Sequence, residues 1–544
     1  MLGQMMQQPL LISSLIVHAE RHHPEREIVS RRVEGDLHRT TYKALAARSR
    51  RMANALAGFG LQMSDRVATL AWNGYRHMEL YYAVSGSGLV LHTINPRLHP
   101  DQIVYIADHA EDRVLFFDLT FLPLIAAVAG RCKTVKRFVA MCDRAALPAD
   151  ALTKVPGLLC YEDLIEAHGD DYAWPEFDEN MASSLCYTSG TTGNPKGVLY
   201  SHRSTLLHTF AAALPDALGC SAADVVLPVV PMFHVNAWGL PYAACMTGAK
   251  LVFPGPALDG KSLYELFESE KVTVSAGVPT VWQGLLGHVQ AHGLKFSTMK
   301  RTVIGGSACP PAMLRTFGDE FGVHVLHAWG MTEMSPLGTV CAFKPGHLAQ
   351  TQEQRYAVMA KQGRAVFGVD MKVVDESRKA LPFGAEATGD LLVRGPWIVS
   401  NYFKGEGGDP LEDGWFPTGD VARIDAEGYM QITDRSKDVI KSGGEWIGSI
   451  DLENIAMAHP AVAMAACIAA PHPKWDERPL LVVMKKPGAA VTRDELLAFF
   501  DGKIAKWWTP DDVVFVDAIP LGATGKMQKN KLREQFKDHQ LPTA

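Results

Sequence analysis

The chain has 544 residues, of which 47% are hydrophobic and 21% charged, and its formal net charge is −6. This composition excludes a disordered or collagen-like chain, and the mildly acidic balance argues against a nucleic-acid-binding surface. The length predicts more than one domain. Nine cysteines are scattered without a CxxC pair, which indicates reduced, mostly buried thiols and neither a disulfide scaffold nor a zinc site.

The first half of the chain alternates between helical and extended patterns. Apolar residues recur at helical spacing through 41–61, and residues 66–72 are predicted to form a buried strand. Residues 83–95 repeat the alternation. Further short strands are predicted at 224–230, 250–253, 273–276 and 301–304. Strands that alternate with helices predict parallel α/β sheets covered on both faces.

After residue 363 the pattern changes to short alternating runs separated by turns, at 371–374, 389–394 and 421–433. This pattern predicts a β-rich unit that follows the α/β body. A last compact α+β region comes after Arg435, so we predict one domain over residues 1–436 and a second over 437–544.

No segment directs the chain to a membrane. The apolar run 461–470 is bounded by two prolines and is shorter than the roughly 20 residues of a spanning helix, so we predict a buried strand there. The N-terminus lacks the basic start of a signal peptide. We therefore expect a cytoplasmic protein.

Residues 187–198, Tyr-Thr-Ser-Gly-Thr-Thr-Gly-Asn-Pro-Lys-Gly-Val, have the composition of a phosphate-binding loop. Glycines allow the backbone to approach a ligand closely, hydroxyls add donors, and Lys196 adds a cation. The segment is not a Walker A motif, because Lys196 is preceded by proline and followed by glycine. P-loop kinases and ATPases are therefore disfavoured, and a flexible surface turn is the alternative interpretation.

This segment resembles the signature of the acyl-adenylate-forming superfamily, which includes acyl-CoA synthetases, adenylation domains of peptide synthetases and firefly-type luciferases. Further family signatures follow in order: PMFHV at 231–235, GGSA at 305–308, WGMTE at 329–333, GWFPTGD at 414–420, DRSKDVIKSGGE at 434–445 and GATGK at 522–526. The resemblance covers nearly the whole chain. It implies an α/β fold with a large N-terminal domain of two α/β sheet subdomains plus a distorted β-barrel, followed by a small mobile α+β C-terminal domain.

The resemblance also implies a two-step reaction. A carboxylate attacks the α-phosphate of MgATP to give acyl-AMP and pyrophosphate, and the thiol of coenzyme A then displaces AMP. An anion that attacks a polyanion develops charge, so a metal ion and fixed cations should converge on the phosphates.

Four residues receive catalytic roles through the resemblance. Glu333 offers a hard oxygen to Mg²⁺, with Thr188 as the second protein contact to the metal, although an ordinary helix-start carboxylate is the alternative. Lys526 lies in a run of turn residues and matches the catalytic lysine, whereas most lysines near a C-terminus are solvated and inert. Lys437 matches the hinge, and His234 matches the residue between the carboxylate and the ATP phosphates.

The implied ATP- and AMP-binding residues come from all of these motifs. They are Thr188, Ser189, Gly190, Thr191, Thr192, Gly193, Lys196, Gly306, Ser307, Ala308, His327, Ala328, Trp329, Gly330, Thr332, Asp420, Arg435, Lys441, Trp446 and Lys526. The 306–308 and 327–329 segments would enclose adenine. For His327 a purely structural role is the alternative.

Asp420 and Arg435 can be paired without the resemblance. The turn at 425–428 lies midway between them and is flanked by alternating strands, so a hairpin returns Arg435 beside Asp420. A carboxylate and a guanidinium together suit a pair of ribose hydroxyls. A structural ion pair across the hairpin is the alternative.

The acyl and CoA sites are implied at two separate places. His234, Val235, Trp238 and Gly306 would surround the acid. Trp238 lies four residues after His234, so on a helix both would face one side. The tryptophan that matches Trp238 gates the acyl tunnel in long-chain synthetases. Simple core packing of Trp238 is the alternative. The CoA residues would be Lys437, Gly443, Gly444 and Glu445, with the glycines lining the pantetheine passage.

Several functions share these motifs. A peptide-synthetase adenylation module would need a carrier domain, and only 18 residues follow Lys526. A regulatory nucleotide-binding protein would be expected to have lost Lys526 or Glu333, and neither is lost. A luciferase-like oxygenase shares the motifs and stays open.

The 231–238 and 442–454 segments resemble the fatty acyl-CoA synthetase branch and, within it, the 3-methylmercaptopropionate-CoA ligases. We therefore expect an acyl-CoA synthetase that acts on a short- to medium-chain fatty acid or on 3-methylmercaptopropionate, with ATP and coenzyme A as co-substrates and Mg²⁺ as cofactor. A long-chain ligase or a stand-alone enzyme that loads a carrier protein are the alternatives. We expect a homodimer, with neither a nucleic-acid partner nor an integral membrane segment.

Overall fold

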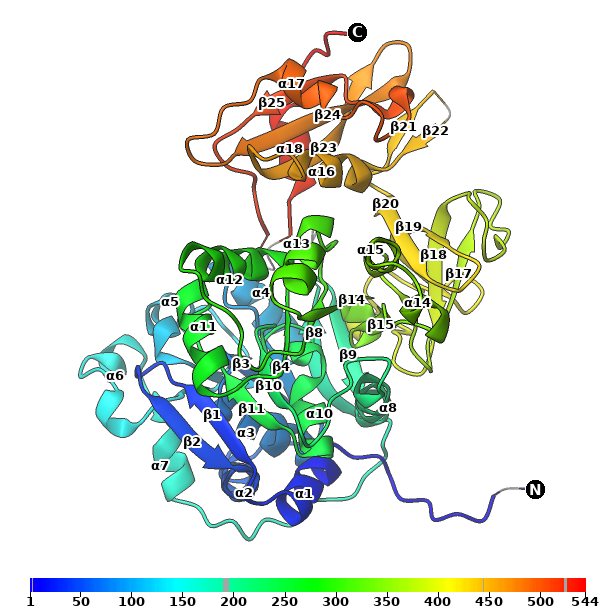
Figure 1. The fold of residues 1–544 in the computed structure, drawn as a ribbon. Coiled ribbons are helices and arrows are strands. Elements are labelled where there is room, and N and C mark those ends of the chain that lie inside the picture. Colours follow the sequence, from blue (N-terminus) through cyan, green and yellow to red (C-terminus); the bar gives the residue numbers. More distant parts are fainter. Residues whose placement is uncertain (2, 189–194, 444, 523–525) are drawn as a thin grey trace.

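A computed structural model describes residues 1, 3–188, 195–443, 445–522 and 526–544. Figure 1 shows a large body formed by the chain up to Arg435 and a smaller C-terminal unit that stands on one side of it. The predicted loop residues Ser189, Gly190, Thr191, Thr192 and Gly193, and Gly444 of the pantetheine motif, lie outside the described residues.

The first sheet has the strand order β7-β6-β5-β3-β4-β8-β9 and is parallel except for its last pair. Its strands are β3 (Arg66–Leu70), β4 (Val90–Thr93), β5 (Asp112–Phe117), β6 (Arg137–Ala140), β7 (Leu159–Cys160), β8 (Ala182–Tyr187) and β9 (Gly197–Ser201). The helices along this part of the chain are α2 (Tyr42–Ala57), α3 (Tyr75–Gly86), α4 (Pro100–Ala110), α5 (Leu122–Val128), α6 (Ala151–Lys154), α7 (Tyr161–Glu166) and α8 (His202–Ala213). The antiparallel β8–β9 pair carries the predicted phosphate-binding loop between its strands.

The second sheet has the order β16-β15-β14-β13-β12-β10-β11-β1-β2 and is parallel through its centre. Its strands are β1 (Glu27–Arg31), β2 (Leu37–Thr41), β10 (Val225–Pro228), β11 (Lys250–Phe253), β12 (Val274–Gly277), β13 (Arg301–Ile304), β14 (His324–Gly330), β15 (Leu337–Val340) and β16 (Arg364–Ala365). The associated helices are α1 (Ser13–His22), α9 (Val235–Trp238), α10 (Leu240–Thr247), α11 (Gly260–Ser269), α12 (Pro279–Ala291), α13 (Pro311–Arg315), α14 (Pro345–Leu348) and α15 (Gln352–Met359). The two predicted parallel α/β sheets are therefore confirmed.

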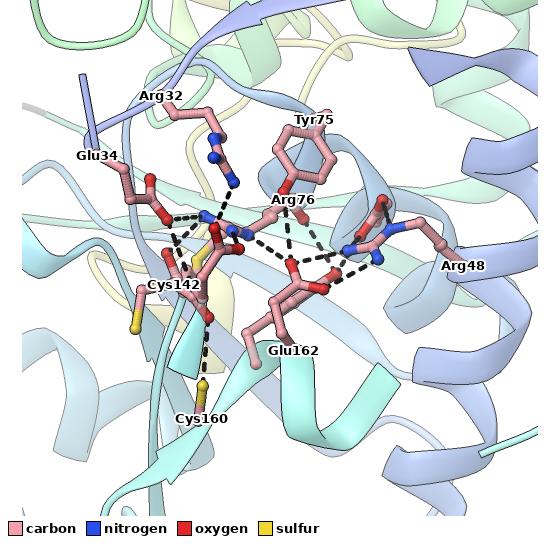
Figure 2. Close-up of polar contacts among 12 residues, drawn as sticks. Arg32, Glu34, Arg48, Tyr75, Arg76, Cys142, Cys160 and Glu162 are labelled. Carbon is pink, nitrogen blue, oxygen red and sulfur yellow. Dashed lines mark hydrogen bonds and ion pairs between the residues drawn. The ribbon is translucent and has the colours of Figure 1, made fainter. Parts of the chain in front are cut away.

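A buried charge network joins these two sheets (Figure 2). Arg76 on α3 contacts Glu34, in the β1–β2 connection, at 2.7 Å and Glu162 on α7 at 2.8 Å. Glu162 also pairs with Arg48 on α2, whose Nε lies 2.6 Å from the fully buried carboxylate of Glu79. Because removal of one member would leave a buried charge without its partner, this network fixes the two sheets relative to each other.

The β-rich unit is an antiparallel sheet in the order β17-β18-β19-β20, formed by β17 (Asp370–Val374), β18 (Gly389–Arg394), β19 (Phe416–Ile424) and β20 (Met430–Arg435). The expectation of a distorted β-barrel is not met. In the described part of the chain no ladder joins β17 to β20, so the sheet is open. One face packs into the main hydrophobic core through residues such as Val373, Leu391 and Ala422. Burial of that face removes the need for closure.

The C-terminal unit has its own sheet and its own core. Its sheet has the order β22-β21-β24-β23, with β25 beside β24, and consists of β21 (Ile440–Ser442), β22 (Glu445–Ile447), β23 (Val462–His472), β24 (Asp476–Lys485) and β25 (Asp512–Phe515). Its helices are α16 (Ser449–Met457), α17 (Arg493–Ala498) and α18 (Lys529–Gln535). The chain passes from the large body into this unit between Arg435 and Ile440. Strand β23 confirms the buried strand predicted at 461–470.

Candidate active site

The β8–β9 hairpin presents the phosphate-binding motif. The backbone N–H of Thr188 donates to the carbonyl of Lys196 at 2.9 Å, and the N–H of Lys196 donates to Oγ1 of Thr188 at 3.1 Å. These two bonds close the base of the segment between them. The hairpin therefore delivers Thr188 and the Lys196 ammonium to the same edge of the first sheet.

A tyrosine connects this hairpin to Glu333. The Lys196 ammonium lies 4.7 Å from the ring centre of Tyr402, whose hydroxyl donates to Oε1 of Glu333 at 2.9 Å. Glu333 is 8% exposed and lies in a short turn after β14. In the same turn the carbonyl of Thr332 accepts a hydrogen bond from the Tyr200 hydroxyl at 2.6 Å. A lysine, a tyrosine and a carboxylate thus lie in a row along the expected polyphosphate path. Sequence reasoning missed Tyr402, since nothing in its local pattern marks it.

The donor set fits the implied Mg²⁺. Mg²⁺ keeps most of its waters and takes one or two carboxylates together with phosphate oxygens. Glu333 is a nearly buried carboxylate whose Oε1 already has one donor, so its orientation is fixed. Glu333 would hold the ion, and the Thr188 hydroxyl is the second candidate ligand.

The Asp420–Arg435 hairpin is confirmed. Strands β19 and β20 place Asp420 opposite Arg435, and Nε of Arg435 lies 2.8 Å from Oδ1 of Asp420. The Trp329 indole N–H donates to Oδ2 of Asp420 at 3.0 Å. Burial raises the pKa of Asp420, and Arg435 and Trp329 oppose that rise. The ribose role of this pair stays a prediction.

The two predicted adenine segments lie side by side, because β13 and β14 are parallel neighbours with Ile304 opposite His327. Segment 305–308 extends from the end of β13, and 327–330 forms the end of β14. A side chain on Gly305 would come within 2.8 Å of the Ala328 carbonyl. Gly306 has φ +82°, a conformation in which glycine is favoured.

His327 is braced by backbone groups on both sides. Its Nε2 accepts from the N–H of Cys309 at 3.2 Å, and its Nδ1 lies 3.2 Å from the carbonyl of Ala360. Burial lowers the pKa of His327 to about 4, so the ring is neutral at pH 7. Both ring nitrogens are therefore occupied within the protein, an arrangement that favours the structural alternative for this residue.

The segment from His234 to Trp238 differs from the helical geometry assumed in sequence reasoning. Residues Val235–Trp238 all have positive φ, between 41° and 57°, so they form a left-handed turn. The inference that His234 and Trp238 share one helix face is therefore wrong. The Trp238 ring instead lies against Gly305, where a Cβ would approach it to 3.2 Å, and Val235 packs in a cluster with Tyr200 and Tyr402.

The C-terminal unit reaches the same place through one loop. Between β25 and α18 the chain descends from the small unit to the large body (Figure 1). Gly522 N–H donates to the carbonyl of Lys526 at 2.7 Å, and Leu521 pairs with Met527, so Lys526 stands at the closing end of a narrow loop.

The electrostatic environment of Lys526 identifies its neighbours. Burial lowers its pKa to about 8, helped by Arg435 and opposed by Asp420 and Glu333. Burial also lowers the pKa of His234 to about 4, with Lys526 adding to the effect. Predicted residues from four separate motifs therefore converge around one ammonium.

The remaining predicted residues lie on the small unit. Lys441 pairs with Trp446 across β21–β22, and its ammonium lies 5.6 Å from the indole. Gly443 has φ +59° and lies against Trp475, which a Cβ would approach to 3.0 Å. Lys437 lies in the connection before β21 and contributes to the lowered pKa of Lys526. Glu445 begins β22.

No helix in the described ranges is both long and apolar enough to span a lipid bilayer.

The AMP-binding enzyme family matches residues 16–403, and the family of AMP-binding enzyme C-terminal domains matches residues 451–526. The first match contains His234 and Glu333, and the second ends at Lys526. Asp420 and Arg435 lie between the two matched ranges.

Relatives match over nearly the whole chain. A 3-methylmercaptopropionyl-CoA ligase of Ruegeria lacuscaerulensis is 58% identical over 99% of both chains. A medium-chain-fatty-acid–CoA ligase of Ectopseudomonas oleovorans is 53% identical over 99% of this chain and 98% of the other. The crystal structure of ATP-bound MatB from Rhodopseudomonas palustris superimposes with a TM-score of 0.81 at 26% identity, covering 97% of this chain and 99% of that one. These matches show that the chain belongs to the AMP-binding enzymes.

Proposed function

We propose that the protein is an AMP-forming acyl-CoA synthetase that activates a carboxylic acid with ATP and then transfers the acyl group to coenzyme A. The observation that carries the proposal is the Lys526 loop, which the small unit extends to the large body (Figure 1), where Arg435, Asp420 and Glu333 act on the pKa of Lys526. The relatives at 53–58% identity, whose names are CoA ligases, support the same reaction class.

In the first half-reaction the acid's carboxylate oxygen forms a bond to the α-phosphorus, and pyrophosphate leaves. The attacking and leaving groups are both anionic, so fixed cations stabilise the transition state more than the ground state. Lys526 supplies one such cation and Lys196 another. Mg²⁺, held by Glu333 and Thr188 when bound, would neutralise phosphate charge.

In the second half-reaction the thiol of coenzyme A loses its proton, its sulfur forms a bond to the acyl carbon, and AMP leaves with the electron pair of the broken acyl–oxygen bond. During the first step Lys526 would lie beside the reacting atoms. Rotation about Lys437 would withdraw it and bring Gly443 and Gly444 to the acyl group, where a side chain would block the thiol. Lys437, Lys441, Trp446 and Glu445 would then lie near coenzyme A or the nucleotide.

For the acid, we propose 3-methylmercaptopropionate or a short- to medium-chain fatty acid. The support is the identity of the relatives and the position of Trp238, whose ring lies against Gly305 where an acyl chain would enter. A relative named long-chain-fatty-acid–CoA ligase, from Thermus thermophilus, is 46% identical, so long-chain acids are the second candidate. We further propose Mg²⁺ dependence, a homodimer and a cytoplasmic location.

The test is a panel of carboxylates assayed for pyrophosphate release with and without coenzyme A. The panel contains 3-methylmercaptopropionate, butyrate, octanoate and palmitate. Acid-dependent pyrophosphate release, followed by a CoA thioester, is the expected result. Adenylate formation without any CoA thioester would instead favour an enzyme that loads a carrier protein, and the absence of acid-dependent release would refute the proposal.

A further inference from the structure

The left-handed turn Val235–Trp238 is an unusual piece of backbone. Four consecutive residues, none of them glycine, have φ of 41°, 51°, 49° and 57°. Side chains disfavour this region, most of all a β-branched one such as Val235, and asparagine tolerates it best. A run of this kind persists only where neighbouring groups hold it in place.

Asn236 is the residue through which the protein holds the turn. Its side-chain Nδ2 donates to the hydroxyl of Ser184 at 2.9 Å, and its Oδ1 accepts from the Tyr81 hydroxyl at 3.4 Å. Asn236 is 3% exposed, and Ser184 is fully buried. Among the described contacts of the turn, Asn236 is the one side chain that makes hydrogen bonds.

The partner strand gives this clamp its significance. Ser184 lies on β8, four residues before Thr188 at the base of the phosphate-binding segment. The clamp therefore ties the turn to the strand that positions the phosphate loop. A shift of the turn relative to β8 would change the distance between the acid and the phosphates.

Both ends of the turn carry residues of the acid site. His234, in extended conformation with φ −129°, precedes it and lines a small cavity together with Thr188 and Phe233. Trp238 ends it with its ring against Gly305. In contrast, the residues proposed to bind ribose, Asp420 and Arg435, are positioned by the pairing of β19 with β20.

We propose that Asn236 is a positioning residue for the acid substrate: its amide, bound to Ser184, locks the left-handed turn and thereby fixes His234 and Trp238 relative to the phosphate loop. This inference rests on the proposed acyl-CoA synthetase function. It explains why a polar, buried side chain lies inside an apolar turn. It also means that the acid site is positioned relative to β8.

Ser184→Ala tests the clamp without changing the turn itself, and Ser183→Ala is its matched control. Ser183 is also fully buried on β8, but its hydroxyl donates to the Tyr200 carbonyl at 3.1 Å and does not contact the turn. Because small misplacements of reacting groups cost up to about 100-fold in rate, we expect Ser184→Ala to lower kcat/KM for the acid by about 10- to 100-fold. We expect the KM for ATP to stay within about twofold and the preference among acids of different length to change.

Asn236→Gly gives a second, independent measurement. Glycine adopts positive φ freely, so the turn is retained while the amide clamp is lost. This variant should lower kcat/KM for the acid at least as much as Ser184→Ala, since it also removes the acceptor of the Tyr81 hydroxyl. The double variant should be no worse than Asn236→Gly alone, because Ser184→Ala breaks a bond that Asn236→Gly already breaks. Thermal midpoints of all variants identify any loss that is due to folding.

Two results would overturn the inference. The first is a Ser184→Ala enzyme whose chain-length preference and KM for the acid match those of Ser183→Ala. The second is full additivity of the Ser184 and Asn236 changes in kcat/KM. Failure of the proposed function itself is recognised separately, since the parent enzyme would then release no pyrophosphate with any acid of the panel.

Discussion

The lowered pKa of Lys526 makes a quantitative prediction about the first half-reaction. Burial, assisted by Arg435 and Lys437, lowers this pKa from 10.5 to about 8. The ammonium is the form that stabilises the developing charge, so activity is present below the pKa and lost as the pH rises through about 8. A group with this pKa is roughly 90% charged at pH 7 and roughly 10% charged at pH 9.

The expected result is a roughly ninefold fall between pH 7 and pH 9 in kcat/KM for ATP in acid-dependent ATP–pyrophosphate exchange, because this parameter reports the enzyme before ATP binds. His234 does not produce this limb, because its pKa is about 4 and its ring is neutral over the whole range. The same enzyme, given preformed acyl-AMP and coenzyme A, should show no fall of this kind. In the proposed second step the small unit would have rotated and Lys526 would have left the reacting atoms.

Two variants separate charge from position. Lys526→Ala removes the ammonium and should lose about 10²–10³ in the first half-reaction, while thioester formation from acyl-AMP stays near the parent rate. Lys526→Arg keeps a cation at every accessible pH, so its residual exchange activity should no longer fall between pH 7 and pH 9. The reasoning is refuted if the limb persists in Lys526→Arg or if Lys526→Ala slows both half-reactions equally.

Three further changes test the neighbouring assignments. Trp238→Ala should change the relative kcat/KM among acids of different length more than the KM for ATP, whereas a uniform loss with a lower thermal midpoint would favour simple packing. Tyr402→Phe keeps the ring beside Lys196 but removes the donor to Glu333. The Mg²⁺ concentration for half-maximal MgATP binding, measured by calorimetry, should rise about three- to tenfold, as expected for the loss of one typical hydrogen bond of about 1 kcal/mol; unchanged metal dependence would contradict that role. Lys437→Pro fixes φ near −65° and should slow thioester formation more than adenylation, and equal damage to both steps would remove the support for a hinge there.

Much of the fold could be predicted because its signals are local. The strands at 250–253, 301–304 and 389–394 have the predicted limits, since each is a short apolar run between turns. The pairing of Asp420 with Arg435 could be predicted for the same reason, because a hairpin with a central turn fixes its own register. Local pattern and tertiary structure agree at these places.

The left-handed turn after His234 could not be predicted, because the interaction that holds it is not local. Its sequence, Val-Asn-Ala-Trp, has no glycine to indicate positive φ, and Ser184, the partner of Asn236, lies 52 positions earlier in the chain. The same holds for Tyr402, which bridges Lys196 and Glu333 from the connection between β18 and β19. Both residues depend on which strands meet in space.

The position of the small unit has a physical consequence for the order of binding. Closure of the Lys526 loop places its ammonium close to Arg435 and Lys437, with Glu333 and Asp420 as the opposing charges. Without a ligand this burial disfavours the charged form, which the lowered pKa expresses. A bound polyphosphate supplies the missing negative charge, so ATP binds the closed arrangement more tightly than an open one and shifts the population toward it. After pyrophosphate leaves, much of that negative charge would be gone and the repulsion among the three cations would return, so we expect the loop to be released for the proposed second half-reaction.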